Sequence, residues 1–78
     1  MADELPIVFT RHALIKLAQR NLTEEMVVRV LEHPAHIVVA GDQIHAYGKF
    51  GRRYLKVAFA RTSDCILVIT QHFVTSLP

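Results

Sequence analysis

Apolar residues follow two different spacings along the chain, and the change between them separates a helical part from an extended part. Between Thr10 and Leu22 they recur every three to four residues, as on one side of an α-helix. Thr10 is a suitable N-cap for this helix, and Asn21 suits the left-handed residue that ends it. The same spacing returns between Thr23 and His33. The pattern therefore predicts two consecutive helices, each with one apolar stripe.

Outside these helices the apolar residues alternate with polar ones, which is typical of β-strands. A short β-branched run at residues 6–9 predicts an edge strand, and four more strands are predicted at 37–40, 43–50, 53–61 and 65–74. The connections between the last four are too short for anything except antiparallel neighbours. The sequence thus predicts an α+β fold: a short N-terminal strand, then a two-helix hairpin packed on one face of a four-stranded antiparallel meander.

Strict alternation assigns the strand residues to two faces of the sheet. The face toward the helices is predicted to hold Leu55, Val57, Phe59, Leu67, Ile69 and Phe73. The open face is predicted to hold His45, Tyr47, Lys49, Tyr54, Lys56, Thr70 and His72, with Arg52 and Arg53 at its rim. The weakest step is the register of strand 43–50, because a single bulge would replace His45, Tyr47 and Lys49 on that face by their neighbours.

Length and composition predict one domain over residues 1–78. The acidic N-terminus lacks the pattern of a signal peptide, and no apolar run is long enough to span a membrane. The single cysteine, Cys65, cannot form an internal disulfide. We therefore expect a cytoplasmic protein without a membrane partner.

The charge is distributed unevenly, although the net charge is only +2. The segment from Tyr47 to Arg61 contains five Lys and Arg residues and no acid. Such local positive potential attracts phosphates. A solvated face on an ordinary small protein explains the same pattern equally well.

The predicted open face suits single-stranded RNA, because rings can stack on unpaired bases while cations hold phosphates. Cleavage of RNA needs no metal or cofactor, since the adjacent 2′-hydroxyl is the nucleophile. We assign proton transfer to Lys56 or His72 and the phosphate clamp to Arg53. Further RNA contacts are assigned to Tyr47, Lys49, Arg52, Tyr54 and Thr70. For any one of these residues, a role in keeping the sheet soluble or in contacting a protein is the alternative.

The remaining histidines do not predict a metal site. His33 and His36 are separated by Pro34, and no usual third ligand lies nearby in the sequence. His12 and Arg20 are interpreted as structural residues, with Arg11, that fasten the first helix to the sheet by hydrogen bonds.

The run F-T-R-H-A-L-I-K-L-A-Q-R-N-L-T-E-E, residues 9–25, resembles the opening of a widespread group of small bacterial and archaeal proteins known only as a domain of unknown function. The usual form in that group is T-R-H-A-x-x-R-x-x-x-R-G-I-[ST]. The segments G-R-R-Y-L-K-V-A-F and V-I-T, residues 51–59 and 68–70, resemble its paired core strands. The group is similar, more remotely, to the RelE, ParE and BrnT toxins of bacterial toxin–antitoxin systems.

This resemblance implies a RelE-like fold and an mRNA-cleaving toxin of a type II system, acting on RNA or the ribosome and held by a small antitoxin protein. Fold does not fix activity, however. A non-catalytic binding or regulatory module of the same fold is the alternative. A homodimer formed by strand addition at an exposed edge is a further expectation.

Overall fold

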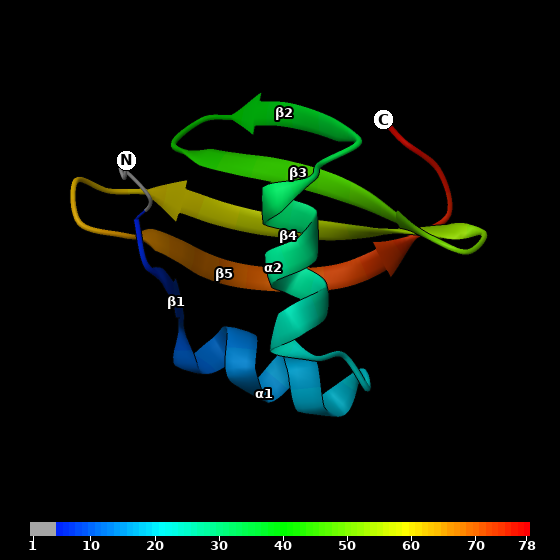
Figure 1. Cartoon of the computed structure of the whole chain (residues 1–78), viewed down its shortest axis with the longest axis horizontal. Coiled ribbons are helices and arrows are strands. Elements are labelled where there is room, and N and C mark those ends of the chain that lie inside the picture. The colour runs from blue at the N-terminus through cyan, green and yellow to red at the C-terminus, as the bar shows by residue number, and fades with distance from the viewer. Residues whose placement is uncertain (1–4) are drawn as a thin grey trace.

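The computed structural model describes residues 5–78 and contains two helices and one sheet (Figure 1). The elements, in chain order, are β1 (Ile7–Phe9), α1 (Arg11–Gln19), α2 (Glu24–Glu32), β2 (His36–Ala40), β3 (Gln43–Phe50), β4 (Arg53–Arg61) and β5 (Ile66–Val74). Thr10 and Thr23 cap the two helices, each accepting a backbone N–H bond from the residue three positions on. Asn21 has the positive φ of 56° expected where the first helix stops. Both helices and their local start and stop signals are therefore confirmed.

The sheet has five strands in the order β1-β5-β4-β3-β2 and is mixed. Strands β2 to β5 pair antiparallel in sequence order, through two-residue turns at Gly41 and Gly51 on either side of β3. The prediction of a four-stranded antiparallel sheet is incomplete, because β1 joins the sheet parallel to β5. The crossover from β1 to β5 runs through both helices and three strands, so no local signal specifies this pairing. Within residues 5–78 no helix is long and apolar enough to cross a membrane.

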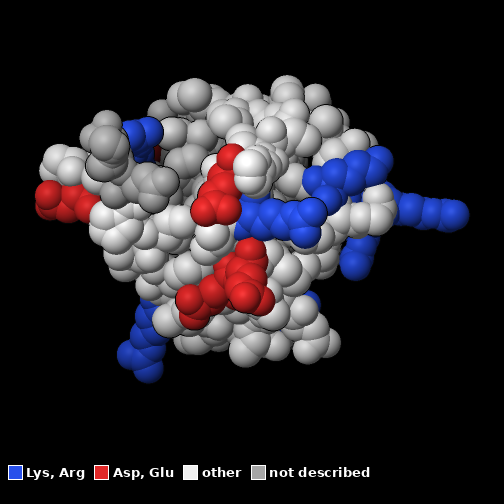
Figure 2. Space-filling view, in the orientation of Figure 1, with Lys and Arg blue, Asp and Glu red and all other residues white. Residues whose placement is uncertain are grey.

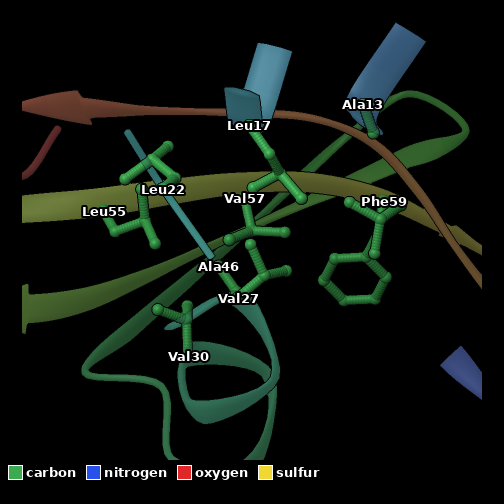
Figure 3. Close-up of a cluster of buried hydrophobic side chains, with 10 residues drawn as sticks. Ala13, Leu17, Leu22, Val27, Val30, Ala46, Leu55, Val57 and Phe59 are labelled. Atoms are coloured by element: carbon green, nitrogen blue, oxygen red, sulfur yellow. The ribbon is translucent and has the colours of Figure 1, made fainter. Parts of the chain in front are cut away.

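The core lies between the helices and one face of the sheet (Figure 3). Ala13 and Leu17 from α1 and Val27 and Val30 from α2 are buried against the inward side chains of β3, β4 and β5. A fully buried Val or Leu contributes about 1.5–3 kcal/mol, so these few residues carry much of the stability. Leu14 follows the helical spacing of apolar residues in this segment, yet it is 44% exposed. The contact stripe of α1 is thus narrower than predicted.

Helix α2 crosses the strands in front of the sheet, whereas α1 lies along its β5 side (Figure 1). Gly48 allows the close approach of α2 to β3, because a Cβ at this position would lie 2.6 Å from Cγ2 of Val30. Strand β2 extends beyond the helices, and its Ile37 and Val39 are 52% and 73% exposed. The layer of helices therefore covers only part of the sheet.

A bulge in β5 changes which of its residues enter the core. Ala58 pairs with Thr70 and Phe59 with Val68, so Ile69 is the extra residue. Val68 is fully buried and Ile66 packs against the core. The prediction that Leu67 and Ile69 line the core is therefore wrong, since alternation cannot be carried across a bulge.

Helix α1 is fastened to β5 at this bulge by polar contacts. The Thr10 hydroxyl donates to the Ile69 carbonyl at 3.3 Å, and the Thr10 amide donates to the Val68 carbonyl at 3.0 Å. Further along, the fully buried Gln71 side chain donates to the Ala13 carbonyl at 3.0 Å. These bonds fix α1 against the strand that carries His72.

Candidate functional site

The face of the sheet opposite the helices carries a row of polar side chains that crosses four strands. The ladder pairs His36 with Tyr47, Tyr47 with Lys56, and Lys56 with His72. Directly opposed residues in antiparallel strands have Cβ atoms about 4.5–5.5 Å apart. The predicted register of strand 43–50 is confirmed, because Tyr47 is opposed to Lys56. The pairing of β4 with β5 brings Lys56 next to His72.

A second row, one step along the strands, completes a small pocket. His45 pairs with Ala58, and Ala58 with Thr70. Ala58 is 5% exposed and its small side chain leaves a hollow between these two larger neighbours. The pocket has a volume of about 130 Å³ and is lined by Gln43, His45, Lys56, Ala58, Thr70 and His72. Pockets that enclose drug-sized ligands measure roughly 300–1,000 Å³, so this pocket suits one small group such as a phosphate.

Burial and neighbouring positive charges lower the pKa of both imidazoles of the pocket, which favours their neutral form. Burial and the neighbouring Lys56 lower the pKa of His45. Burial lowers the pKa of His72 in the same way, followed by the effects of Lys56, Arg20 and His45. Gln43 Oε1 also lies 3.4 Å from Nε2 of His45. A neutral imidazole beside a cation can accept a proton, and an anion in the pocket would favour its protonated form.

The aromatic side chains of this face differ in accessibility. Tyr47 is only 5% exposed, and its ring lies 5.9 Å from the His36 ring. The Tyr47 ring is therefore packed between its neighbours in the row. The prediction that it stacks on an RNA base does not fit this burial. Tyr54 is half-buried, with Lys49 Nζ 5.2 Å from its ring centre. Lys49 and Tyr54 are directly opposed, one row beyond Lys56, so a ring and a cation flank the pocket.

The structure does not bring Arg53 together with Lys56 and His72. The guanidinium of Arg53 lies 3.9 Å from the ring centre of Phe73, which packs against the core on the helix side. Arg53 is thus on the opposite face, because it lies three positions before Lys56 and residues an odd number of positions apart point to opposite faces of a strand. Arg52 is exposed in the β3–β4 turn. Figure 2 shows the helix side, where acidic side chains gather over α2 and Lys and Arg gather at the right-hand end of the sheet.

The three signature residues of α1 lie in different environments. Arg20 Nη1 donates a hydrogen bond of 2.7 Å to the carbonyl oxygen of Gln71, the residue immediately before His72. Arg11 and His12 are exposed at the start of α1, and the side-chain hydrogen bonds found within residues 5–78 do not include them. Arg20 thus makes the expected bond to the sheet, whereas the other contacts that hold α1 to β5 come from Thr10 and Ala13 and not from Arg11 and His12.

Sequence reasoning placed His45 on the open face without giving it a role in proton transfer, and it did not single out Ala58 or Gln43. Alternation alone could have suggested His45, two residues before Tyr47. Its proximity to Lys56 required the pairing of β3 with β4. Among residues 5–78 no three His, Cys, Asp or Glu side chains gather as a metal-binding group.

A family model described as a domain of unknown function, DUF4258, matches residues 9–70. The chain belongs to the DUF4258 family. The match covers α1 and every pocket residue except His72. His72 lies just beyond the match, as does Gln71, which bonds to Ala13 and Arg20. No curated protein matches the chain, and neither does any solved structure. For this DUF4258 domain, a functional interpretation therefore rests on the geometry of the open face.

Proposed function

We propose that this DUF4258 domain is a metal-independent endoribonuclease, acting as the toxin of a type II toxin–antitoxin system. The observation that carries the proposal is the cluster of His45, Lys56 and His72 around one phosphate-sized pocket. One neutral imidazole, one protonated imidazole and a cation are the groups that transfer of an RNA phosphoryl group to its own 2′-hydroxyl requires. The flanking Tyr54 and Lys49 fit an unpaired base and the next phosphate.

The reaction follows from these groups. One imidazole accepts the proton of the ribose 2′-hydroxyl, and the 2′-oxygen forms a bond to phosphorus. The bond from phosphorus to the 5′-oxygen breaks, and the other imidazole, in its protonated form, donates a proton to that oxygen. Lys56 stabilises the negative charge that develops on the phosphoryl oxygens. The products are a 2′,3′-cyclic phosphate and a free 5′-hydroxyl, with no change in oxidation state.

The remaining parts of the proposal rest on the sequence. The T-R-H-A run resembles the opening of proteins that are remotely similar to RelE-type toxins, and this resemblance is the basis for proposing a RelE-like fold, a ribosome-bound mRNA substrate, an antitoxin partner and a cytoplasmic location. Thr10 and Ala13 of that run make the contacts that position β5. The run that carries the resemblance therefore contacts β5, the strand that contributes Thr70 and His72 to the pocket.

Cleavage of a single-stranded RNA oligonucleotide in excess EDTA tests the activity directly. We expect cyclic-phosphate products from the wild type. Loss of one group that transfers a proton typically costs about 100- to 10,000-fold in rate, so His45→Ala and His72→Ala should each fall in this range. Lys56→Ala removes a group that stabilises charge and should cost about 100- to 1,000-fold.

Arg61→Ala is the matched control, because it removes one cation from the far end of the same strand, where Arg61 is exposed. It should cleave at the wild-type rate. Cleavage that survives all three pocket substitutions would contradict the proposal, as would an absence of cleavage and of RNA binding in the wild type. Binding without cleavage would favour the non-catalytic module.

A further inference from the structure

Strand β2 is an exposed edge without any of the features that normally protect one. Among residues 5–78 it pairs only with β3, so no strand that the structure describes lies against its other side. Its sequence, H-I-V-V-A, has no Lys, Arg, Asp, Glu or Pro. Proteins usually blunt an edge strand with charges, proline or bulges. By contrast, the opposite edge, β1, is only three residues long.

The side chains of β2 are apolar on the side where the helices end. Ile37 and Val39 are opposed to Ala46 and Ile44, which belong to the core face of β3. The core therefore continues onto β2, but α2 packs on β3 and β4 and leaves these two side chains uncovered. Val39, at 73%, has the largest exposed fraction among the large apolar residues that the structure describes.

We propose that β2 pairs with β2 of a second copy of this chain, antiparallel and centred on Val38. This pairing sets Ile37 against Val39 of the other copy, and Val39 against its Ile37, so that four exposed side chains cover one another on the helix side. A two-fold arrangement must be self-complementary. Because β2 has no Lys, Arg, Asp or Glu, two copies can pair without charge repulsion. The strand also has no charged side chain with which to bind a charged partner.

The direction in which the backbone N–H and C=O groups of β2 point agrees with this register. In a two-residue hairpin the residues next to the turn, here Ala40 and Gln43, form a hydrogen-bonded pair, and every second pair repeats it. Val38 is in phase with Ala40, so the peptide groups of Ile37 and Val39 point away from β3. A strand centred on Val38 uses these outward groups. The two sheets then form one, and both open faces lie on the same side.

Solution mass, by light scattering or sedimentation, tests the dimer independently of any ribonuclease activity. The wild type should have twice the chain mass of 8.9 kDa across the micromolar range. Val39→Lys should be monomeric, with an unchanged circular dichroism spectrum. Ile15→Lys, at a side chain 47% exposed on α1, should remain dimeric. A monomeric wild type, or a dimer unaffected by Val39→Lys, would overturn the proposal.

Cysteine cross-linking tests the register. In a Cys65→Ser background, Val38→Cys places two thiols in a directly opposed pair without hydrogen bonds, where Cα atoms lie about 4.5 Å apart, a distance that a disulfide can span. Oxidation should convert this variant to a covalent dimer. Val39→Cys faces Ile37 of the other copy and should cross-link much less. Equal or inverted yields would exclude a pairing centred on Val38.

Discussion

Arg20, at the end of α1, donates a hydrogen bond of 2.7 Å to the carbonyl oxygen of Gln71 in β5, the residue before His72. The bond joins residues 51 positions apart and sets a fixed positive charge beside the candidate site. Arg20 therefore has two measurable effects, one on stability and one on the ionisation of His72.

Arg20→Gln should destabilise the protein, because a charged donor to a β5 carbonyl is lost. Hydrogen bonds to charged groups contribute about 1.5–3 kcal/mol. In a domain of this size each kcal/mol corresponds to about 4–8 °C in melting temperature. Arg11→Gln is the control with the same charge change at an exposed position, and calorimetry should show it within about 0.5 kcal/mol of wild type. Equal melting temperatures for the two variants would contradict the structural role.

The ionisation of the two imidazoles should respond differently to two substitutions. Lys56→Met removes a cation that lowers the pKa of both His45 and His72, so both pKa values should rise toward the ordinary value of 6.5. Arg20 lowers the pKa of His72 and is not among the causes for His45, so Arg20→Gln should raise only the pKa of His72. Histidine ring protons followed by NMR across the acidic range will show whether this selectivity exists.

The pH dependence of cleavage follows from the same shifts. The reaction needs one neutral and one protonated imidazole, and both pKa values lie below 6.5 in the free protein. The bell-shaped profile of kcat/KM should therefore be centred below pH 6.5, with its acidic limb set by protonation of the base. In Lys56→Met the residual activity should have its maximum at higher pH. A profile that rises steadily above pH 8 would point instead to a lysine acting as the base.

Ala58→Leu tests the pocket without removing any reactive group. The larger side chain should fill the hollow between His45 and Thr70, which exists because Ala58 is small. We expect loss of cleavage with both imidazoles and Lys56 still present. Val74→Leu, on the same face beside Tyr54, enlarges a side chain outside the pocket and should have little effect. Activity retained in Ala58→Leu would show that the reacting phosphate lies elsewhere.

Gly48→Ala should lower stability by about 1–3 kcal/mol, the usual cost of overpacking a core. Its new Cβ would lie 2.6 Å from Cγ2 of Val30, so α2 must shift away from β3. The double variant with Val30→Ala, which removes the obstructing methyl groups, should be less unstable than the sum of the two single changes. Urea unfolding measures this difference, and strict additivity would show that the contact is not responsible.

Local signals predicted the helices and strands well, because each is encoded by neighbouring residues. Thr10, Thr23 and Asn21 mark helix ends through their own backbone preferences, and Gly41 and Gly51 provide the positive φ of 67° and 65° that tight turns require. The register of β3 was also predicted, since its turns fix the opposing residues.

The errors arose where distant segments meet. Nothing near Ile7 or Ile66 indicates that they pair in parallel, and nothing within β5 indicates that Ile69 bulges. The bulge becomes intelligible only with Thr10 bound to the Ile69 carbonyl. The placement of Arg53 at the rim of the open face is a different kind of error, because alternation within β4 alone puts it on the other face, beside Phe73.

The sequence by itself determined which segments are helices and strands and which side chains of β3 and β4 share a face, because the 3.6- and 2-residue periods are properties of a single segment. The tertiary structure decided that His45, Lys56 and His72 surround one pocket, that Tyr47 is buried beside Lys56, and that β2 is left uncovered. Those outcomes depend on strand order and on how far the helices reach. Both are set by packing between residues far apart in the chain.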